Sequence, residues 1–403
     1  MAEKDRRKQT VTRVEYPFAT KEQIEIAEQA RIILENELKP RLEELEAGDG
    51  GKGHFPVEVA KILADAGYLG ITIPKKYGGL ELDCVTRCLI EEEMSKIDAG
   101  FTFAIHGTSN LQFPYIAKSK IPEEEKQEWA RKIMAGESFG AICFTEAQAG
   151  SDASAITTTA VYDEKNDEYV LNGLKCFASN GPIADHFIIF AWTDRTQKPS
   201  RGISAFLVEK ERGVKIGSIE NKLGLKMSKT SEIVLEDVRV PADHLCGEPG
   251  RAYKMFLAGM DEIRVSGMVF SLGIAQAAID EAVSYAKVRE TMGKPIIRHQ
   301  GLGFLLADMQ TRTDAARALL YQGARCVDAG IPLGTTSSSS KNFVSNATVQ
   351  TVIDAMEVLG GYGYMKDYPI EKLFRDAKIF TIFDGTTEVN KMVIARQLEA
   401  KYK

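Results

Sequence analysis

Five short segments of the chain gather most of the residues that could do chemistry. They are CFTEAQAGSDAS (143–154), NGLKCFASNG (172–181), RETMGKPIIRHQ (289–300), EVLGGYGY (357–364) and IFDGTTEVNKMVIARQ (382–397). Hydroxyls and glycine amides in the first two can hydrogen-bond a polar ligand, and adjacent glycines let the backbone approach a ligand closely. The carboxylate of Asp384 can accept a proton. The chain therefore offers parts of a ligand-binding site and a candidate base.

The composition of the 403-residue chain excludes several classes of protein. Lys and Arg total 51 against 57 Asp and Glu, so a basic surface for nucleic acid is not expected. No apolar run approaches the ~18 residues that cross a bilayer, and the N-terminus lacks an apolar signal core. We therefore expect no membrane insertion and a bacterial cytoplasmic location. The six cysteines form no Cys-x-x-Cys pair, and Cys84 and Cys88 have no nearby histidine, so no metal site is expected.

Three compositional blocks must position the chemically able residues. Residues 21–136 have the apolar spacing of helices, whereas 138–241 hold about six short β-branched and aromatic stretches between turn signals. From residue 251 four longer helical stretches follow, which predicts a four-helix bundle. We therefore predict an α+β protein with an N-terminal α-helical domain (1–137), a middle antiparallel β-domain (138–247) and a C-terminal four-helix bundle domain (248–403).

Two local patterns qualify this division. No strand is followed by Gly-x-Gly-x-x-Gly, which argues against a dinucleotide site of the Rossmann type. The polar run TTSSSS (335–340) is interpreted as a loop that leads into a helix N-terminus. The charged extension 1–18 carries no functional prediction.

Taken together, the five segments resemble the acyl-CoA dehydrogenase family of flavoproteins, in order and in spacing, over about residues 20–400. The resemblance implies an FAD cofactor, an acyl-CoA substrate and an electron-transferring flavoprotein as the electron acceptor. It also implies that one subunit completes the FAD site of another, so that the protein is a dimer at minimum and usually a homotetramer, a dimer of dimers.

The resemblance assigns cofactor contacts to particular residues. Those matching its FAD-binding positions are Phe144, Thr145, Gly150, Ser151, Phe177, Ser179, Arg289, Gln300, Gly360, Gly361, Thr386 and Glu388. Arg289, Gln300 and the two glycines match positions that reach the FAD of a neighbouring subunit. The chain departs from the usual family pattern at several positions. Phe177 stands where Trp is commoner, and Met292 stands where a Phe often follows Arg-x-Thr. Ala147 and Gln148 stand where Pro and Gly are usual. Glu357 replaces a common Gln, and we do not assign this carboxylate to a diphosphate.

The resemblance makes Asp384 the catalytic base. Most of the family has Glu in a Tyr-Glu-Gly-Thr motif, which here reads Phe383-Asp384-Gly385-Thr386, and the alternative base position carries Ile263. Asp is shorter than Glu by about 1.5 Å, and a misplacement of that order costs roughly a hundredfold in rate. We therefore expect a substrate that fills the vacated space: a branched, alicyclic (such as cyclohexanecarboxyl-CoA) or aryl- or carboxyl-substituted acyl group. The alternative is that Asp384 is only a turn residue before Gly385.

The substrate contacts implied by the resemblance are Ser151, His106, Met260, Asp261, Arg264 and Gly385. Arg264 could hold a CoA oxygen, or it could simply pair with Asp261 three residues earlier on a helix. His106 falls where the family lines the far end of the acyl pocket, and there it could bind a polar tail or be a satisfied helix histidine.

Two other functions stay open at this point. Nitroalkane oxidases of the same superfamily also use an aspartate base and need no CoA, although Ser151, Asp261 and Arg264 favour CoA. A non-catalytic relative that retains FAD is the third possibility, in which Asp384 would be dispensable.

Overall fold

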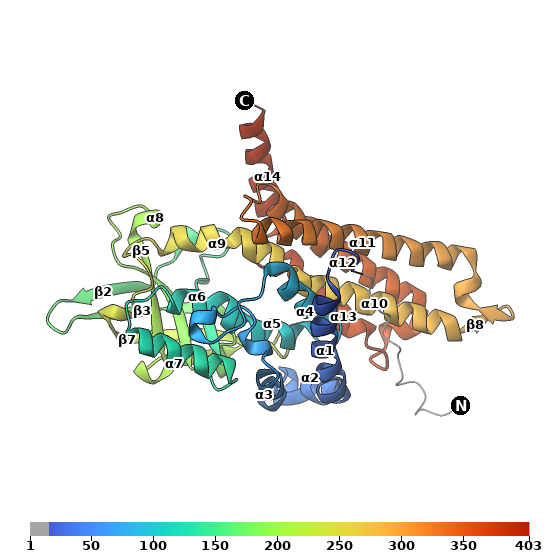
Figure 1. Ribbon diagram of the computed structural model, residues 1–403, viewed down its shortest axis with the longest axis horizontal. Coiled ribbons are helices and arrows are strands. Elements are labelled where there is room, and N and C mark those ends of the chain that lie inside the picture. Colours follow the sequence, from blue (N-terminus) through green and yellow to red (C-terminus); the bar gives the residue numbers. More distant parts are fainter. Residues whose placement is uncertain (1–15, 403) are drawn as a thin grey trace.

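The computed structural model describes residues 16–402, so most of the extension 1–18 lies outside the described residues (Figure 1). The N-terminal part is helical. Thr20 and Gln23 form a capping box at the first helix, and the carboxylates of Asp83 and Asp98 accept the N–H groups of Thr86 and Phe101 at the starts of two others. The helices are α1 (Lys21–Glu37), α2 (Leu42–Gly51), α3 (Val57–Asp65), α4 (Cys84–Ser95), α5 (Ala99–Gly107), a π-helical turn (Thr108–Gln112), α6 (Phe113–Ile116) and α7 (Glu123–Met134).

The middle part is a seven-stranded sheet. Its strands are β1 (Gly140–Cys143), β2 (Thr159–Asp163), β3 (Glu168–Ser179), β4 (His186–Trp192), β5 (Ile203–Glu209), β6 (Lys215–Ile219) and β7 (Thr230–Pro241), with a short helix α8 (Pro199–Gly202) before β5. The order is β1-β4-β2-β3-β7-β6, and β5 pairs with β4.

The prediction of a purely antiparallel sheet was wrong in one respect. Strand β4 runs parallel to β1 and, through the single pair Thr159–Trp192, to β2; the other pairings are antiparallel. The reason is topological. In the sequence, the hairpin of β2 and β3 comes between β1 and β4, and β4 then returns to lie beside β1 in the same direction. Alternation of side chains along a strand carries no information about that direction.

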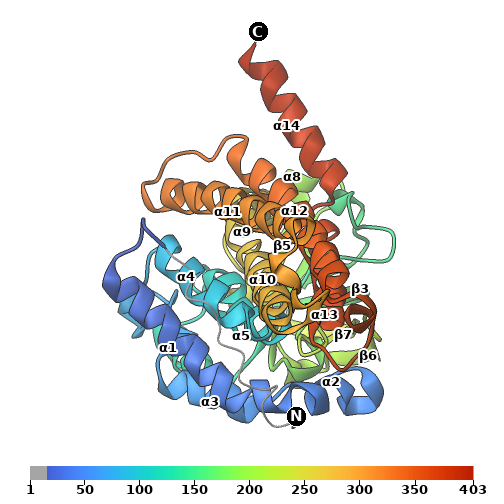
Figure 2. The ribbon, with the colours of Figure 1, turned by 90° about the vertical axis from the view of Figure 1, so that its right-hand side faces the viewer.

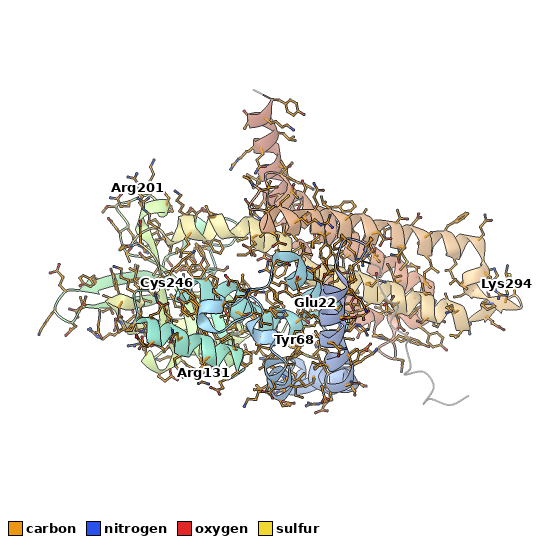
Figure 3. The ribbon with its side chains drawn as sticks, viewed as in Figure 1. Glu22, Tyr68, Arg131, Arg201, Cys246 and Lys294 are labelled. Atoms are coloured by element: carbon orange, nitrogen blue, oxygen red, sulfur yellow. The ribbon has the colours of Figure 1, made fainter. Side chains whose placement is uncertain are left out.

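The C-terminal part holds the longest helices. They are α9 (Ala252–Ser266), α10 (Val269–Val288), α11 (Gln300–Asp328), α12 (Thr336–Leu359), α13 (Ile370–Ala377) and α14 (Thr387–Lys401), with a hairpin of β8 (Glu290–Thr291) and β9 (Lys294–Pro295). Lys294 lies at this hairpin, at the opposite end of the molecule from Arg201 of the middle part (Figure 3). Helix α14 projects from the body of the protein (Figures 1 and 2).

Three details of this part differ from the prediction. The first predicted helical stretch, 254–289, breaks at Gly267–Met268, and the last, 369–402, breaks between Ala377 and Thr387. The run 335–340 is not a loop, because α12 begins at Thr336 and takes in all of the serines. Buried serines can be held within a helix by its packing, which local composition does not reveal.

One hydrophobic core joins the N-terminal and C-terminal helices. Helix α4 packs against α10 and α11, and the core cluster runs from Leu34 through Leu89 and Leu272 to Leu320 and Phe380. The stretch 252–288 is apolar and long enough to span a membrane by composition, but 72% of its most apolar window is buried within the protein, as in a core helix. The helices of the two parts therefore form one body.

Candidate active site

Asp384 lies in a tight turn between a 3₁₀ turn (Lys378–Thr381) and α14. Two consecutive residues of this turn, Asp384 and Gly385, have positive φ angles of 55° and 88°. The turn is held from α14, since Asn390 Nδ2 donates to the carbonyl of Gly385 at 2.8 Å and the Thr386 hydroxyl caps the helix by accepting the N–H of Val389. Non-glycine residues in this region are strained and cluster at functional sites.

The carboxylate of Asp384 lies against the break between α9 and α10. A Cβ built on Gly267 would sit 3.3 Å from Asp384 Oδ2 and only 2.7 Å from the carbonyl oxygen of Ile263, so glycine suits that position. Within residues 16–402 no side chain or N–H donates a hydrogen bond to this carboxylate, whereas its backbone carbonyl receives a long hydrogen bond from Arg264 Nε, at 3.5 Å. The acid group is thus held by its backbone and left available for a ligand.

An aromatic wall lines the approach to this turn. The ring of Phe383 lies 5.7 Å from that of Phe103 in α5, which lies 5.6 Å from that of Phe270 in α10. Burial raises the pKa of Asp384 to about 6, and the charges of Lys341 and Arg264 oppose that rise. A carboxyl with a pKa near neutrality is matched to general-base work.

Phe177 occupies a β-bulge in β3. Its φ is 55°, its side chain is 64% exposed, and the register between β3 and β7 shifts around it. The N–H of Cys176 donates to the carbonyl of Thr145 at 2.9 Å, so the bulge lies beside the segment 143–154. The structure therefore brings together Thr145 and Phe177. The hydroxyl residue Thr145 is half-buried, and the aromatic ring of Phe177 is exposed. Bulges re-aim side chains in this way next to functional sites.

A buried ion pair that the sequence did not suggest supports that segment. Lys175 Nζ lies 2.8 Å from Glu146 Oε1 and donates to the carbonyl of Phe144, while Glu146 also accepts from the N–H and hydroxyl groups of Thr157 and Thr158. Although burial opposes it, Lys175 with these donors lowers the pKa of Glu146 to about 2. The available signal was a lysine in an otherwise apolar strand segment.

The other predicted residues of this segment differ in their accessibility. The ring of Phe144 packs between Phe190 and Phe256 in the core, so its side chain is buried, and its carbonyl accepts a hydrogen bond from Lys175. Gly150 and Ser151 are exposed, and Ser179 is half-buried at the end of β3.

Helix α5 links this segment to the turn of Asp384. The side-chain amide of Asn180, next to Ser179, donates to the carbonyl of Ala104 at 2.7 Å. The preceding residue, Phe103, packs against Phe383. Helix α5 therefore contacts both the chain just after β3, near the bulge, and the turn that carries the candidate base.

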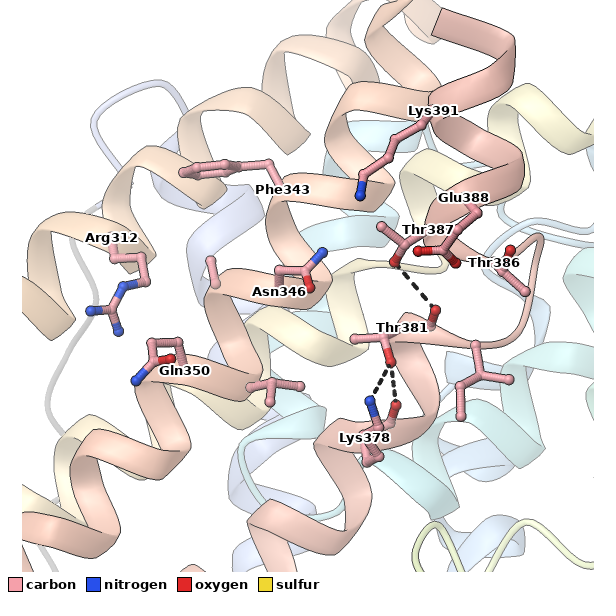
Figure 4. Close-up of a pocket in the computed structure, with 13 residues that line it drawn as sticks. Arg312, Phe343, Asn346, Gln350, Lys378, Thr381, Thr386, Thr387, Glu388 and Lys391 are labelled. Carbon is pink, nitrogen blue, oxygen red and sulfur yellow. Dashed lines mark hydrogen bonds between the residues drawn. The ribbon is translucent and has the colours of Figure 1, made fainter.

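A pocket of about 790 Å³ opens beside the start of α14 (Figure 4). Two predicted cofactor residues, Thr386 and Glu388, line it together with the cationic side chains of Arg312, Lys378 and Lys391. Arg312 is paired with Asp354 at 2.8 Å, so the excess positive charge comes from Lys378 and Lys391 against the one carboxylate of Glu388, which favours an anionic ligand there.

A second pocket, of about 490 Å³, contains Arg289, Gly360 and Gly361, three residues predicted to reach a neighbour's cofactor. A Cβ on either glycine would meet nothing within 4 Å, so the backbone is open to a ligand. Gln300, the first residue of α11, is exposed but does not line this pocket.

The predicted substrate residues on α9 form a network of their own. Arg264 Nη1 lies 3.4 Å from Asp261 Oδ1, and the same oxygen accepts the Ser337 hydroxyl of α12 at 2.7 Å. Met260 is buried, whereas Asp261 is partly exposed. Arg264 therefore pairs with Asp261 and also reaches the turn of Asp384, which is the structural alternative that the sequence left open.

His106 is fully buried between α5 and α4. Its Nδ1 lies 3.5 Å from Glu91 Oε1, beyond a good hydrogen bond, and neither ring nitrogen has a hydrogen-bond partner among the described residues. Burial lowers the pKa of His106 to about 3, so the ring is neutral at physiological pH. A satisfied helix histidine is not what the structure shows.

Three family models match successive parts of the chain. They are the N-terminal domain of acyl-CoA dehydrogenase at residues 20–137, the middle domain at 141–238 and the C-terminal domain at 253–399. The chain belongs to the acyl-CoA dehydrogenase family.

Individual relatives of this chain are similar to it over almost their whole length. An acyl-CoA dehydrogenase of Bacillus subtilis is 39% identical over 382 residues, 94% of this chain and 98% of the relative. The acryloyl-CoA reductase (NADH) of Anaerotignum propionicum is 39% identical over 97% and 98%, and the caffeyl-CoA reductase-Etf complex subunit CarC of Acetobacterium woodii is 36% identical over 92% and 97%. The structure of butyryl-CoA dehydrogenase from Megasphaera elsdenii has a TM-score of 0.89 at 34% identity, covering 96% of this chain and all of that one.

Members of the family are FAD flavoproteins, and the residues of this chain fit that cofactor. Phe177 offers an exposed ring at a strained bulge, suited to packing against a flavin. The cations around Thr386 and Glu388, together with the open backbone at Gly360 and Gly361, suit a diphosphate. These are two separate pockets, and no residue lines both.

Proposed function

We propose that this chain oxidises an acyl-CoA thioester between Cα and Cβ, with Asp384 as the base. The observation that carries the proposal is the carboxylate of Asp384: it lies in a strained turn, accepts no hydrogen bond from the described residues, and has a pKa raised to about 6 beside an aromatic wall. A residue that only formed a turn would gain nothing from an uncompensated carboxylate in such surroundings.

The residues divide the work as follows. Asp384 takes the proton from Cα, and the electron pair of that C–H bond forms the double bond as the hydride leaves Cβ. FAD, when bound, supplies the acceptor for that hydride. Phe103, Phe270 and Phe383 exclude water from the carboxylate, and Asn390 with Thr386 fixes the turn that aims it. The exposed ring of Phe177 and the hydroxyl of Thr145 orient the cofactor.

The substrate we propose has a branched, alicyclic or aryl-bearing acyl group. The shorter side chain of Asp384 leaves space beside an aromatic wall, which a bulky apolar group fills. The neutral ring of His106 supplies no positive charge, so carboxyl-substituted acyl groups are the least favoured of the proposed substrates. Fast reduction of the flavin by a straight-chain butyryl thioester, with none by cyclohexanecarboxyl-CoA, would overturn this choice.

The reverse reaction, reduction of the double bond, is a second candidate function, and the names of three relatives favour it. Relatives at 36–39% identity carry the names acryloyl-CoA reductase (NADH), 3-(aryl)acrylate reductase and caffeyl-CoA reductase-Etf complex subunit CarC. In the reductive direction Asp384 in its acid form would donate the proton to Cα. We infer an electron-transferring flavoprotein as the redox partner in either direction, supported by the Etf in the name of the last relative.

We further propose a homotetramer in which a partner completes each cofactor site. The pocket lined by Arg289, Gly360 and Gly361 is separate from the pocket lined by Thr386 and Glu388. One FAD that contacts both sets of residues would therefore bind them from two different chains. Helix α14 exposes Met392 by 54% and Tyr402 by 78%, as expected of a helix that another subunit covers. Sedimentation of the purified protein tests this, and a monomer that retains FAD would contradict it.

The decisive experiment is anaerobic flavin reduction by a panel of acyl-CoA thioesters. We expect bleaching by at least one of them, and we expect Asp384→Asn to lower the reduction rate by about 10²–10⁴-fold at unchanged FAD content. Asp367→Asn, an exposed acid of the same domain, serves as the charge control. Bleaching by nitroalkanes alone, or full activity of the Asp384 variant, would contradict the proposal.

A further inference from the structure

A buried lysine on α12 has no counter-charge in contact with it. Lys341 is fully buried, and its Nζ has no hydrogen-bond partner among the described residues. No ion pair within 4 Å involves it in the part of the chain that the structure describes. An ammonium group taken out of water without a partner is costly, so its presence calls for an explanation.

The helix geometry places Lys341 opposite the break between α9 and α10. Four residues before it, Ser337 donates to Asp261 of α9; seven residues after it, Thr348 bonds Ser271 of α10 at 2.8 Å. Residues at these spacings share one face of a helix. Lys341 therefore lies between two contacts that span the break, on the side of α12 that faces α9 and α10.

Asp384 meets the same break. Its Oδ2 lies 3.3 Å from where a Cβ of Gly267 would be. In the sequence, Gly267 lies between Asp261 of α9 and Ser271 of α10, two residues that α12 contacts. The lysine and the carboxylate thus approach one point of the fold from different elements, α12 and the turn before α14.

The charges around this point are few. The charges of Asp384, Arg264 and Glu388 affect the pKa of Lys341. The charges of Lys341 and Arg264 affect the pKa of Asp384. Of these, Arg264 is balanced by Asp261, and Glu388 belongs to the pocket at the start of α14. Lys341 is therefore the cation near Asp384 with no carboxylate of its own.

We propose that Lys341 is a positioning residue that keeps Asp384 in its anionic form, ready to take the Cα proton. The aromatic wall alone would favour the neutral carboxylic acid, and a fixed buried cation nearby opposes that effect without occupying the carboxylate oxygens. The inference rests on the proposed role of Asp384 as the base. It adds a second residue, from a run of sequence that looks like a polar loop.

The test is the pH profile of flavin reduction in Lys341→Met, a substitution of similar length without charge. We expect the pKa of the base to move up by about one unit from about 6, so that the rate at pH 6 falls about fivefold while the rate at pH 9 stays within about twofold of the native protein. Lys341→Arg, which keeps the charge, should restore the native profile. Lys254→Met, an exposed lysine on α9, controls for net charge.

A second readout does not depend on turnover. The carboxyl carbon of Asp384, labelled with ¹³C and assigned by its loss in Asp384→Asn, should titrate at higher pH in Lys341→Met than in the native protein. An unchanged titration, or an equal loss of rate at every pH, would overturn the inference. If no acyl-CoA reduces the flavin of the native protein, the proposed function fails, and this titration still decides whether Lys341 governs Asp384.

Discussion

Two buried lysines of the C-terminal domain have opposite surroundings. Lys372 of α13 contacts Asp98 at 2.7 Å and also Asp376, with Glu46 at 3.9 Å. Lys341 of α12 contacts no carboxylate within residues 16–402. Although burial opposes it, the carboxylates raise the pKa of Lys372 well above its usual value, whereas burial lowers the pKa of Lys341 to about 8.

The compensated lysine sits at a junction of all three parts of the protein. Asp98 comes from the N-terminal helices, and Asp376 accepts the N–H of Leu225 from the middle part at 2.6 Å. Lys372 therefore helps to fix the three parts against each other. The difference between the two lysines teaches that a buried charge with partners holds the fold, whereas one left without partners is available to act on a neighbouring reacting group.

The largest effect we expect comes from Lys372→Met. Removing this cation leaves the carboxylates of Asp98, Asp376 and Glu46 buried together, which should lower the free energy of unfolding by about 3–5 kcal/mol. Urea denaturation of the FAD-loaded protein at fixed concentration measures this loss. Lys366→Met, at an exposed position of the same domain, should change stability by less than about 0.5 kcal/mol. A loss of that small size at Lys372 would mean that the junction does not depend on its charge.

The matching substitution at Lys341 should behave differently. Because no partner is stranded when the ammonium group is removed, Lys341→Met should leave the free energy of unfolding unchanged or raise it by about 1 kcal/mol. The same urea series measures it at pH 7.5. A loss as large as that of Lys372→Met would show that Lys341 has a structural partner, and the contrast between the two lysines would disappear.

Sequence reasoning could name candidate site residues, but it could not name the contacts that support them. The motifs that pointed to Thr145, Phe177 and Asp384 are local, and the structure sets Thr145 beside Phe177 and joins them to the Asp384 turn through α5. The approach of Asp384 to Gly267 at the helix break could not be predicted, because the two residues lie 117 positions apart in the chain.

The misread polar run shows the same limit. Ser337, Ser338 and Ser340 have the composition of a loop, yet they pack inside α12, and Lys341 directly after them is buried. Burial of these side chains depends on α9, which lies some 80 residues earlier and contacts α12 only in the folded chain. Patterns within a short window record helix or strand periods, but they do not record which distant element will cover a polar residue.

The pH dependence of stability is the most specific test of the comparison, because between pH 7.5 and 10 the contribution of Lys341 should change and that of Lys372 should not. Between about pH 8 and 10.5 the unfolded chain keeps a proton on Lys341 that the folded chain, in which the pKa of Lys341 is about 8, has lost. The free energy of unfolding of the native protein should therefore rise relative to Lys341→Met as pH increases from 7.5 to 10, by on the order of 1–2 kcal/mol.

At Lys372 the pKa is raised in the folded protein, so its contribution to stability is complete below about pH 10.5 and is lost only above that value. The difference between the native protein and Lys372→Met should thus stay constant from pH 7.5 to 10. Urea denaturation at the two pH values, with both variants and the native protein in parallel, makes the measurement. Parallel shifts in the two variants would mean that Lys341 is as well compensated as Lys372, and Asp384 would then lack the free cation that we assign to it.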